Sequence, residues 1–78
     1  MMSSDELLLH AFENSAGHLA NLDIVRSIVD GLTGNRLSLD DIIRNLEGEI
    51  NEAEVTVKTD LRILINEIRH LMRRMTSG

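Results

Sequence analysis

Residues 57–75 read VKTDLRILINEIRHLMRRM, and this stretch decides the fold class. Its main apolar residues follow one another at alternating intervals of four and three: Val57, Leu61, Leu64, Ile68, Leu71 and Met75. This heptad spacing places them along one side of an α-helix, as in helices that pack lengthwise on other helices. The stretch therefore predicts a long C-terminal helix.

The apolar surface of this helix is wider than one stripe, because Ile65 and Met72 lie beside it and Ile63 projects elsewhere. An aliphatic stripe at helical spacing usually packs inside its own chain, and we expect this first for Leu61, Leu64 and Ile68. For the residues beside the stripe, a contact with a second molecule is equally supported. The predicted dimer or partner interface comprises Val57, Leu61, Leu64, Ile65, Ile68, Leu71, Met72 and Met75.

A first helix is expected near the N-terminus. Ser3 followed by Glu6 fits a capping box, in which each side chain bonds to the other residue's backbone N–H. The helix then runs from about Ser4 to Asn14 and ends in a break at residues 14–17. Its apolar side presents Leu8, Ala11 and Phe12.

A second helix is predicted from about Leu19 to Leu32, followed by a turn at residues 33–36, Thr-Gly-Asn-Arg. Its apolar repeat at intervals of three and four comprises Leu22, Val25, Ile28, Val29 and Leu32.

A third helix begins after Ser38, with Asp41 in the position of a capping-box acid. Its apolar residues are Leu39, Ile42, Ile43, Leu46 and Ile50. Glycine destabilises a helix by about 1 kcal/mol, so we place the corner before the last helix between Gly48 and Asn51. One long bent helix is the alternative.

The composition agrees with an all-α fold of three to four short helices ending in the long C-terminal one. Aliphatic residues dominate, proline is absent, and Phe12 is the sole aromatic residue. A chain of 78 residues makes one domain, residues 1–78, with a small core. Without cysteine it has no disulfide to support that core, so self-association into a homodimer is expected.

The net charge of −5 is unevenly distributed. Residues 1–57 hold eleven acids and three arginines, whereas residues 58–78 hold five basic and two acidic residues. The basic end either complements the helix dipole or meets an acidic surface on a partner or second protomer. The candidate electrostatic contacts are Arg62, Arg69, Arg73, Arg74, Asp40 and Asp41.

Catalytic, cofactor and metal motifs are absent from the sequence. His10, His18 and His70 are scattered, and the acid pairs at residues 5–6 and 40–41 suit first turns of helices. The acids after Asp40 do not follow the order of a calcium-binding loop. We therefore predict a protein that is not an enzyme and uses no cofactor.

Nucleic acid and membrane are both disfavoured as partners. A stripe of Lys58, Arg62, Arg69 and Arg73 could contact DNA, but the acidic remainder opposes its approach, so DNA binding stays a minor alternative. No apolar run reaches the roughly 18 residues of a membrane span. No signal peptide is apparent, so we expect a cytoplasmic protein.

A set of residues, in this order along the chain, suggests a known family: Phe12, Ser15, Leu19, Gly34-Asn35, Ile42-Ile43, Leu46, Lys58-x-Asp60 and Glu67-Ile68. It resembles the small enterobacterial biofilm and acid-resistance regulators of the AriR/YmgB type, also called two-component-system connector proteins, over about residues 11–71. The resemblance implies a helical homodimer that modulates a signalling or transcription pathway through protein contacts. It implies no cofactor and no turnover.

This chain departs from the family pattern at two places. Residues 47–51, Glu-Gly-Glu-Ile-Asn, stand where the family continues apolar and ends on a Leu-Glu pair. The arginine common in the family's last helix is matched by Arg62 one position away. These differences concern partner recognition more than the fold.

Two further functions remain open. An acidic inhibitor encoded by a phage or mobile element could mimic nucleic acid with Asp40, Asp41, Glu47, Glu49, Glu52 and Glu54. Alternatively, the chain could be a small assembly subunit that orders only with a larger partner.

Overall fold

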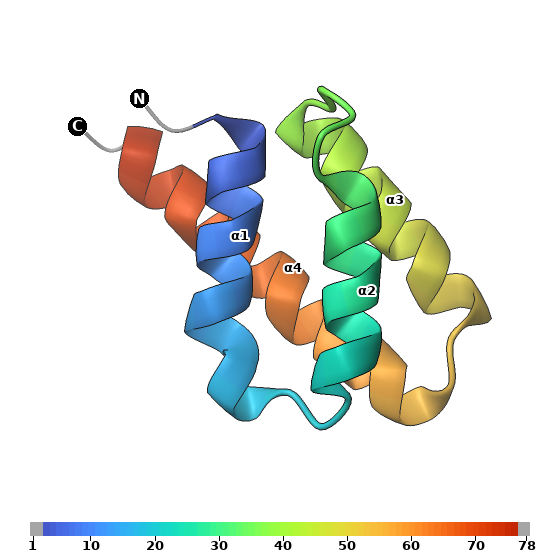
Figure 1. Cartoon of the computed structure of the whole chain (residues 1–78). Coiled ribbons are helices and arrows are strands. Elements are labelled where there is room, and N and C mark those ends of the chain that lie inside the picture. Colours follow the sequence, from blue (N-terminus) through green and yellow to red (C-terminus); the bar gives the residue numbers. More distant parts are fainter. Residues whose placement is uncertain (1–2, 77–78) are drawn as a thin grey trace.

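The computed structural model describes residues 3–76 and contains four α-helices (Figure 1). They are α1 (Ser4–Ser15), α2 (Leu22–Leu32), α3 (Leu39–Glu52) and α4 (Val55–Thr76), with a 3-10 turn, η1 (Ala16–His18), after α1. No strand occurs in the described part of the chain. The predicted all-α class and the long C-terminal helix, 22 residues in α4, are both confirmed.

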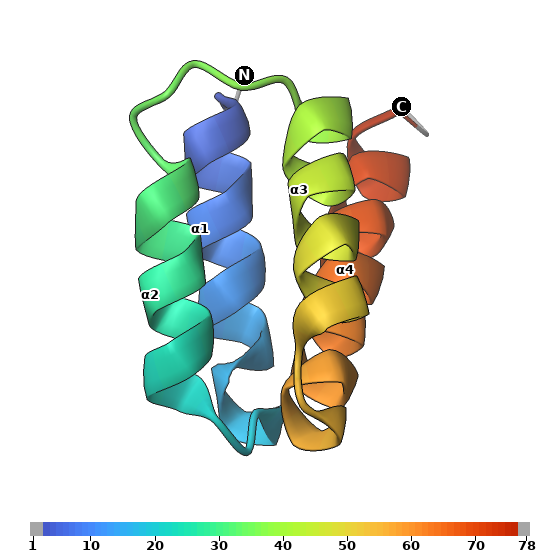
Figure 2. The same cartoon turned by 90° about the vertical axis from the view of Figure 1, so that its right-hand side faces the viewer.

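The helices form two layers, with α1 and α2 in one and α3 and α4 in the other (Figure 2). Helix α4 contacts each of the other three helices, so it is the common element of the fold. The buried hydrophobic residues of the core are all aliphatic, and α4 supplies more of them than any other helix. They are Leu7, Leu8, Ala11, Val25, Val29, Ile42, Ile43, Leu46, Val57, Leu61, Leu64, Ile65 and Ile68.

Helix α1 begins at the predicted cap. The Ser3 hydroxyl accepts a hydrogen bond from the backbone N–H of Glu6 at 3.1 Å. The helix continues to Ser15, one residue further than predicted. Leu8 and Ala11 are buried as expected, but Leu7 is also buried. Helix α1 therefore presents a broader apolar side than the spacing indicated.

Helix α2 begins at Leu22, so the predicted start at Leu19 is wrong. The backbone N–H groups of Ala20 and Asn21 donate to the two carboxylate oxygens of Asp60, at 3.0 and 2.6 Å. This carboxylate satisfies free donors at the helix N-terminus and interacts favourably with the helix dipole. It holds the preceding residues outside the helix.

Because the predicted start of α2 was too early, Leu22 was wrongly included in its apolar repeat. Leu22 is 39% exposed in the first turn of α2, whereas Val25 and Val29 are buried. Leu19, the predicted first residue of the helix, lies before it and packs partly against the core. The apolar repeat of α2 therefore begins one turn later than predicted.

The predicted turn between α2 and α3 is confirmed. Gly34 has φ of 82° and Arg36 has φ of 55°, both in the left-handed region. The Gly34 N–H donates to the Asp5 carboxylate at 2.9 Å, which ties the turn to the start of α1.

Helix α3 starts at the predicted cap, where the Ser38 hydroxyl accepts from the Asp41 N–H at 3.2 Å. The predicted corner between Gly48 and Asn51 is wrong, because α3 continues to Glu52. Ile50 packs partly against the core, and this burial outweighs the helix cost of Gly48, which is about 1 kcal/mol.

Helices α3 and α4 are separate, so the alternative of one bent helix is also wrong. Ala53 adopts an extended conformation, with φ of −84° and ψ of 158°, and ends α3. Helix α4 then returns antiparallel to α3 (Figures 1 and 2).

Candidate functional site

Most of the predicted interface on the last helix lies inside the chain's own core. Exposure is 6% for Val57, 0% for Leu61, Leu64 and Ile68, and 4% for Ile65. Val57, Leu61, Leu64 and Ile68 are therefore not available at a surface, which corrects the prediction that they contact a partner, and Ile65 reaches the surface only where it lines the groove described below. The reason is that α4 packs against all three other helices.

Three residues of the predicted interface keep exposed surface at the C-terminal end of α4. Leu71 and Met72 are half-buried and pack against the edge of the core. Met75 is 47% exposed. Three apolar side chains near the C-terminal end of α4, beside Arg73 and Arg74, therefore keep exposed surface.

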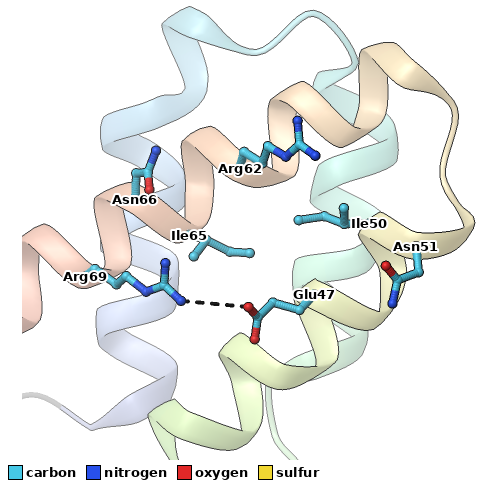
Figure 3. Close-up of a pocket in the computed structure, with 7 residues that line it drawn as sticks. All are labelled: Glu47, Ile50, Asn51, Arg62, Ile65, Asn66 and Arg69. Carbon is cyan, nitrogen blue, oxygen red and sulfur yellow. Dashed lines mark ion pairs between the residues drawn. The ribbon is translucent and has the colours of Figure 1, made fainter.

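A groove with a volume of about 470 Å³ lies between α3 and α4 (Figure 3). Helix α4 contributes one wall and α3 the other. The lining residues are Glu47, Ile50, Asn51, Arg62, Ile65, Asn66 and Arg69.

Helical periodicity explains how the α4 wall is built. Arg62, Ile65 and Arg69 are separated by three and four residues, so they lie along one edge of the helix. Figure 3 shows the two arginines on either side of Ile65. Ile65 is buried and the arginines are exposed, so the groove combines an apolar floor with a cationic rim.

The two ends of the groove differ in charge. Arg69 forms an ion pair with Glu47 across the groove, at 3.8 Å between the nitrogen and the carboxylate oxygen. Both side chains are about half exposed, 51% and 57%, so this pair contributes little to stability. Arg62 forms no ion pair among residues 3–76, and α3 presents the neutral Asn51 in the groove.

The other predicted electrostatic contacts lie away from the groove lining. Asp40 and Asp41 are in the first turn of α3, where they complement the helix dipole. Arg73 and Arg74 are in the last turn of α4, where cations are likewise favourable. The structure therefore brings together Arg62 and Arg69, but not the full predicted set.

The six acids proposed as a nucleic-acid mimic do not share one surface. Glu47 lines the groove with α4, whereas Glu49 and Glu52 line a separate hollow on α3 together with Arg44. Glu54 lies beyond the end of α3. The negative charge is divided between different sides of the helix.

The three histidines, His10, His18 and His70, are all exposed. Within residues 3–76, no group of three or more histidine, aspartate and glutamate side chains is placed to hold a metal ion. The described helices include none with the length and apolar character needed to cross a membrane.

Sequence reasoning missed the α3 side of the groove. The sequence analysis counted Ile50 among the apolar residues of the third helix, but the predicted corner between Gly48 and Asn51 gave Asn51 no place in that helix. The available signal was on α4, where Ile65 is flanked by an arginine three residues before it and another four residues after it.

Comparison of the chain with protein families, curated proteins and solved structures finds no match. The resemblance to the AriR/YmgB type therefore stays a prediction. Several residues that carry it have structural roles here: Ile42, Leu46 and Ile68 are buried, and Asp60 accepts the backbone N–H groups of the two residues before α2.

Proposed function

We propose that this chain is a small, non-enzymatic regulatory protein that forms a homodimer and binds another protein. The observation that carries the proposal is the division of α4 into two surfaces. Its inner side fills the core, while its outer edge carries two arginines along an open groove. Following the resemblance, we assign the protein to a bacterial signalling or transcription pathway in the cytoplasm.

The groove supports protein binding because it joins an apolar floor to polar groups that can fix the orientation of a ligand. Ile65 supplies buried apolar surface, while the arginines and Asn51 supply hydrogen-bond donors at the rim. Binding sites commonly combine an apolar hollow with a few such groups.

The C-terminal end of α4 supports self-association. Leu71, Met72 and Met75 place apolar surface at the edge of a small core. Burying such surface against a second copy would add stability to a chain whose core is small.

Light scattering over low to high micromolar concentrations tests the dimer. We expect a mass twice that of the chain, and a mass close to one chain for Met75→Asp, because a buried charge opposes the contact. The control is Val55→Asp, at a side chain that is 76% exposed in the first turn of α4. It should remain dimeric. A folded, monomeric wild type at high micromolar concentration would refute the dimer.

A further inference from the structure

We propose that the α3–α4 groove binds an acidic amphipathic helix of a partner protein. A carboxylate of that helix pairs with Arg62, and a neighbouring apolar side chain lies over Ile65. This inference rests on the proposed function, because it specifies the chemistry of the partner that the groove accepts.

The form of the groove suits a helix. It lies between two antiparallel helices, and Ile50 and Ile65 supply apolar surface from opposite walls (Figure 3). Amphipathic helices bind in such grooves by placing apolar residues, spaced three or four apart, on the floor. The polar rim then contacts the edges of the bound helix.

The charge of the groove selects an acidic partner. The whole chain carries a net charge of −5, yet this groove holds two arginines against one glutamate. Glu47 already pairs with Arg69, whereas Arg62 has no ion pair within residues 3–76. A guanidinium binds a carboxylate through two parallel hydrogen bonds, so Arg62 is the primary anchor.

The spacing of these two groups defines the partner sequence. Arg62 and Ile65 are three residues apart on one edge of α4. A partner helix meets both when its acidic and apolar side chains are also three or four residues apart, because such pairs share one side of a helix. The expected motif is therefore a glutamate or aspartate with leucine or isoleucine at that distance.

A second copy of the chain is a poorer occupant of this groove. Two grooves placed face to face bring together two hollows, with four arginines against two glutamates, which leaves space unfilled and an excess of positive charge. The dimer contact at the end of α4 and the partner site in the groove are therefore separate surfaces.

Three synthetic peptides test the inference by amide chemical-shift titration of the full chain. The first is an alanine-based helix with Glu and Leu four residues apart, and the others replace every Glu by Gln or by Lys. We expect saturable shifts at the groove residues of α3 and α4 with the acidic peptide. Replacement by Gln should weaken binding roughly tenfold, and replacement by Lys should abolish it.

A matched pair of variants locates the anchor. Arg62→Gln should weaken binding of the acidic peptide roughly tenfold, because it removes the charge-assisted pair. Arg44→Gln changes an exposed arginine that lines the separate hollow on α3, and it should change the affinity by less than about twofold. Circular dichroism confirms that both variants keep the wild-type helix content.

Several outcomes would overturn the inference: no saturable shift with the acidic peptide, equal losses in the two variants, or tighter binding of a short DNA duplex. The mass of each sample separates this failure from that of the proposed function. If the protein is a dimer but does not bind the peptide, only the groove assignment is refuted. A monomer that binds the peptide refutes only the dimer.

Discussion

Asp60 is a carboxylate in the interior of an otherwise aliphatic core, with only 2% of its surface exposed. Its two oxygens accept the backbone N–H groups of Ala20 and Asn21, which are 40 and 39 residues away in the chain. A buried charge is stabilising only when such hydrogen bonds replace its hydration. This single side chain therefore joins α4 to the start of α2.

Replacing Asp60 by Asn should lower the free energy of unfolding by about 2 kcal/mol, since an amide presents a donor to one backbone N–H and loses the charge. Urea unfolding followed by circular dichroism measures the change. Glu67→Gln is the control, because the Glu67 carboxylate accepts a single exposed hydrogen bond, from the Asn14 side-chain amide at 3.1 Å. It should cost no more than about 0.5 kcal/mol. Equal losses would contradict the role assigned to Asp60.

At the scale of the element, α3 shows how packing overrides a local preference. Gly48 and Asn51 both favour a helix end, yet α3 runs through them to Glu52. Ile50 reaches the core only if the helix continues, and Asn51 then faces the groove. The additional turn of α3 is therefore what completes the second wall of the candidate site.

The extension of α3 is tested by two glycine substitutions with opposite expected effects on the free energy of unfolding: Gly48→Ala within α3, and Gly34→Ala in the turn as the comparison. Gly48→Ala should raise the free energy of unfolding by about 1 kcal/mol, because alanine favours the helix and its methyl group meets open space. Gly34→Ala should lower it by about 1–2 kcal/mol, because φ of 82° strains any residue with a Cβ. Urea titrations of both variants measure the difference. A loss at Gly48 would mean that the helix ends where the sequence predicted.

At the scale of the molecule, α4 holds the other helices together because its apolar residues are shared among them. Leu61, Leu64 and Ile68 are completely buried in one chain. The sequence analysis divided the wide apolar surface of α4 between a core and a partner. Most of that surface is buried within the chain itself. What α4 leaves exposed includes its charged outer edge along the groove and Met75 near its C-terminal end.

Leu64→Ala should lower the free energy of unfolding by about 2–5 kcal/mol through lost burial and a residual cavity. Domains are stable by only about 5–15 kcal/mol, so this loss should be a large part of the total here. Val55→Ala, at the exposed start of α4, should cost less than about 0.5 kcal/mol. Thermal unfolding followed by circular dichroism compares the stability of the two variants. Similar curves would show that α4 is not the centre of the core.

The all-α class, the long last helix, both serine caps and the turn at Gly34 were predictable from the sequence, because each depends on residues close together in the chain. Periodicity and capping chemistry act over one or two helical turns, and they identify which side of a helix is apolar. They do not identify what covers that side.

Three features depended on contacts between distant residues, and only the tertiary structure decided them. Asp60 set the start of α2 from 39 and 40 residues away, burial of Ile50 set the end of α3, and packing of three helices on α4 moved the predicted interface into the core. The groove arises from the last two together. Its walls come from separate helices, and the free energy of burying apolar surface, rather than any local preference, brings those helices side by side.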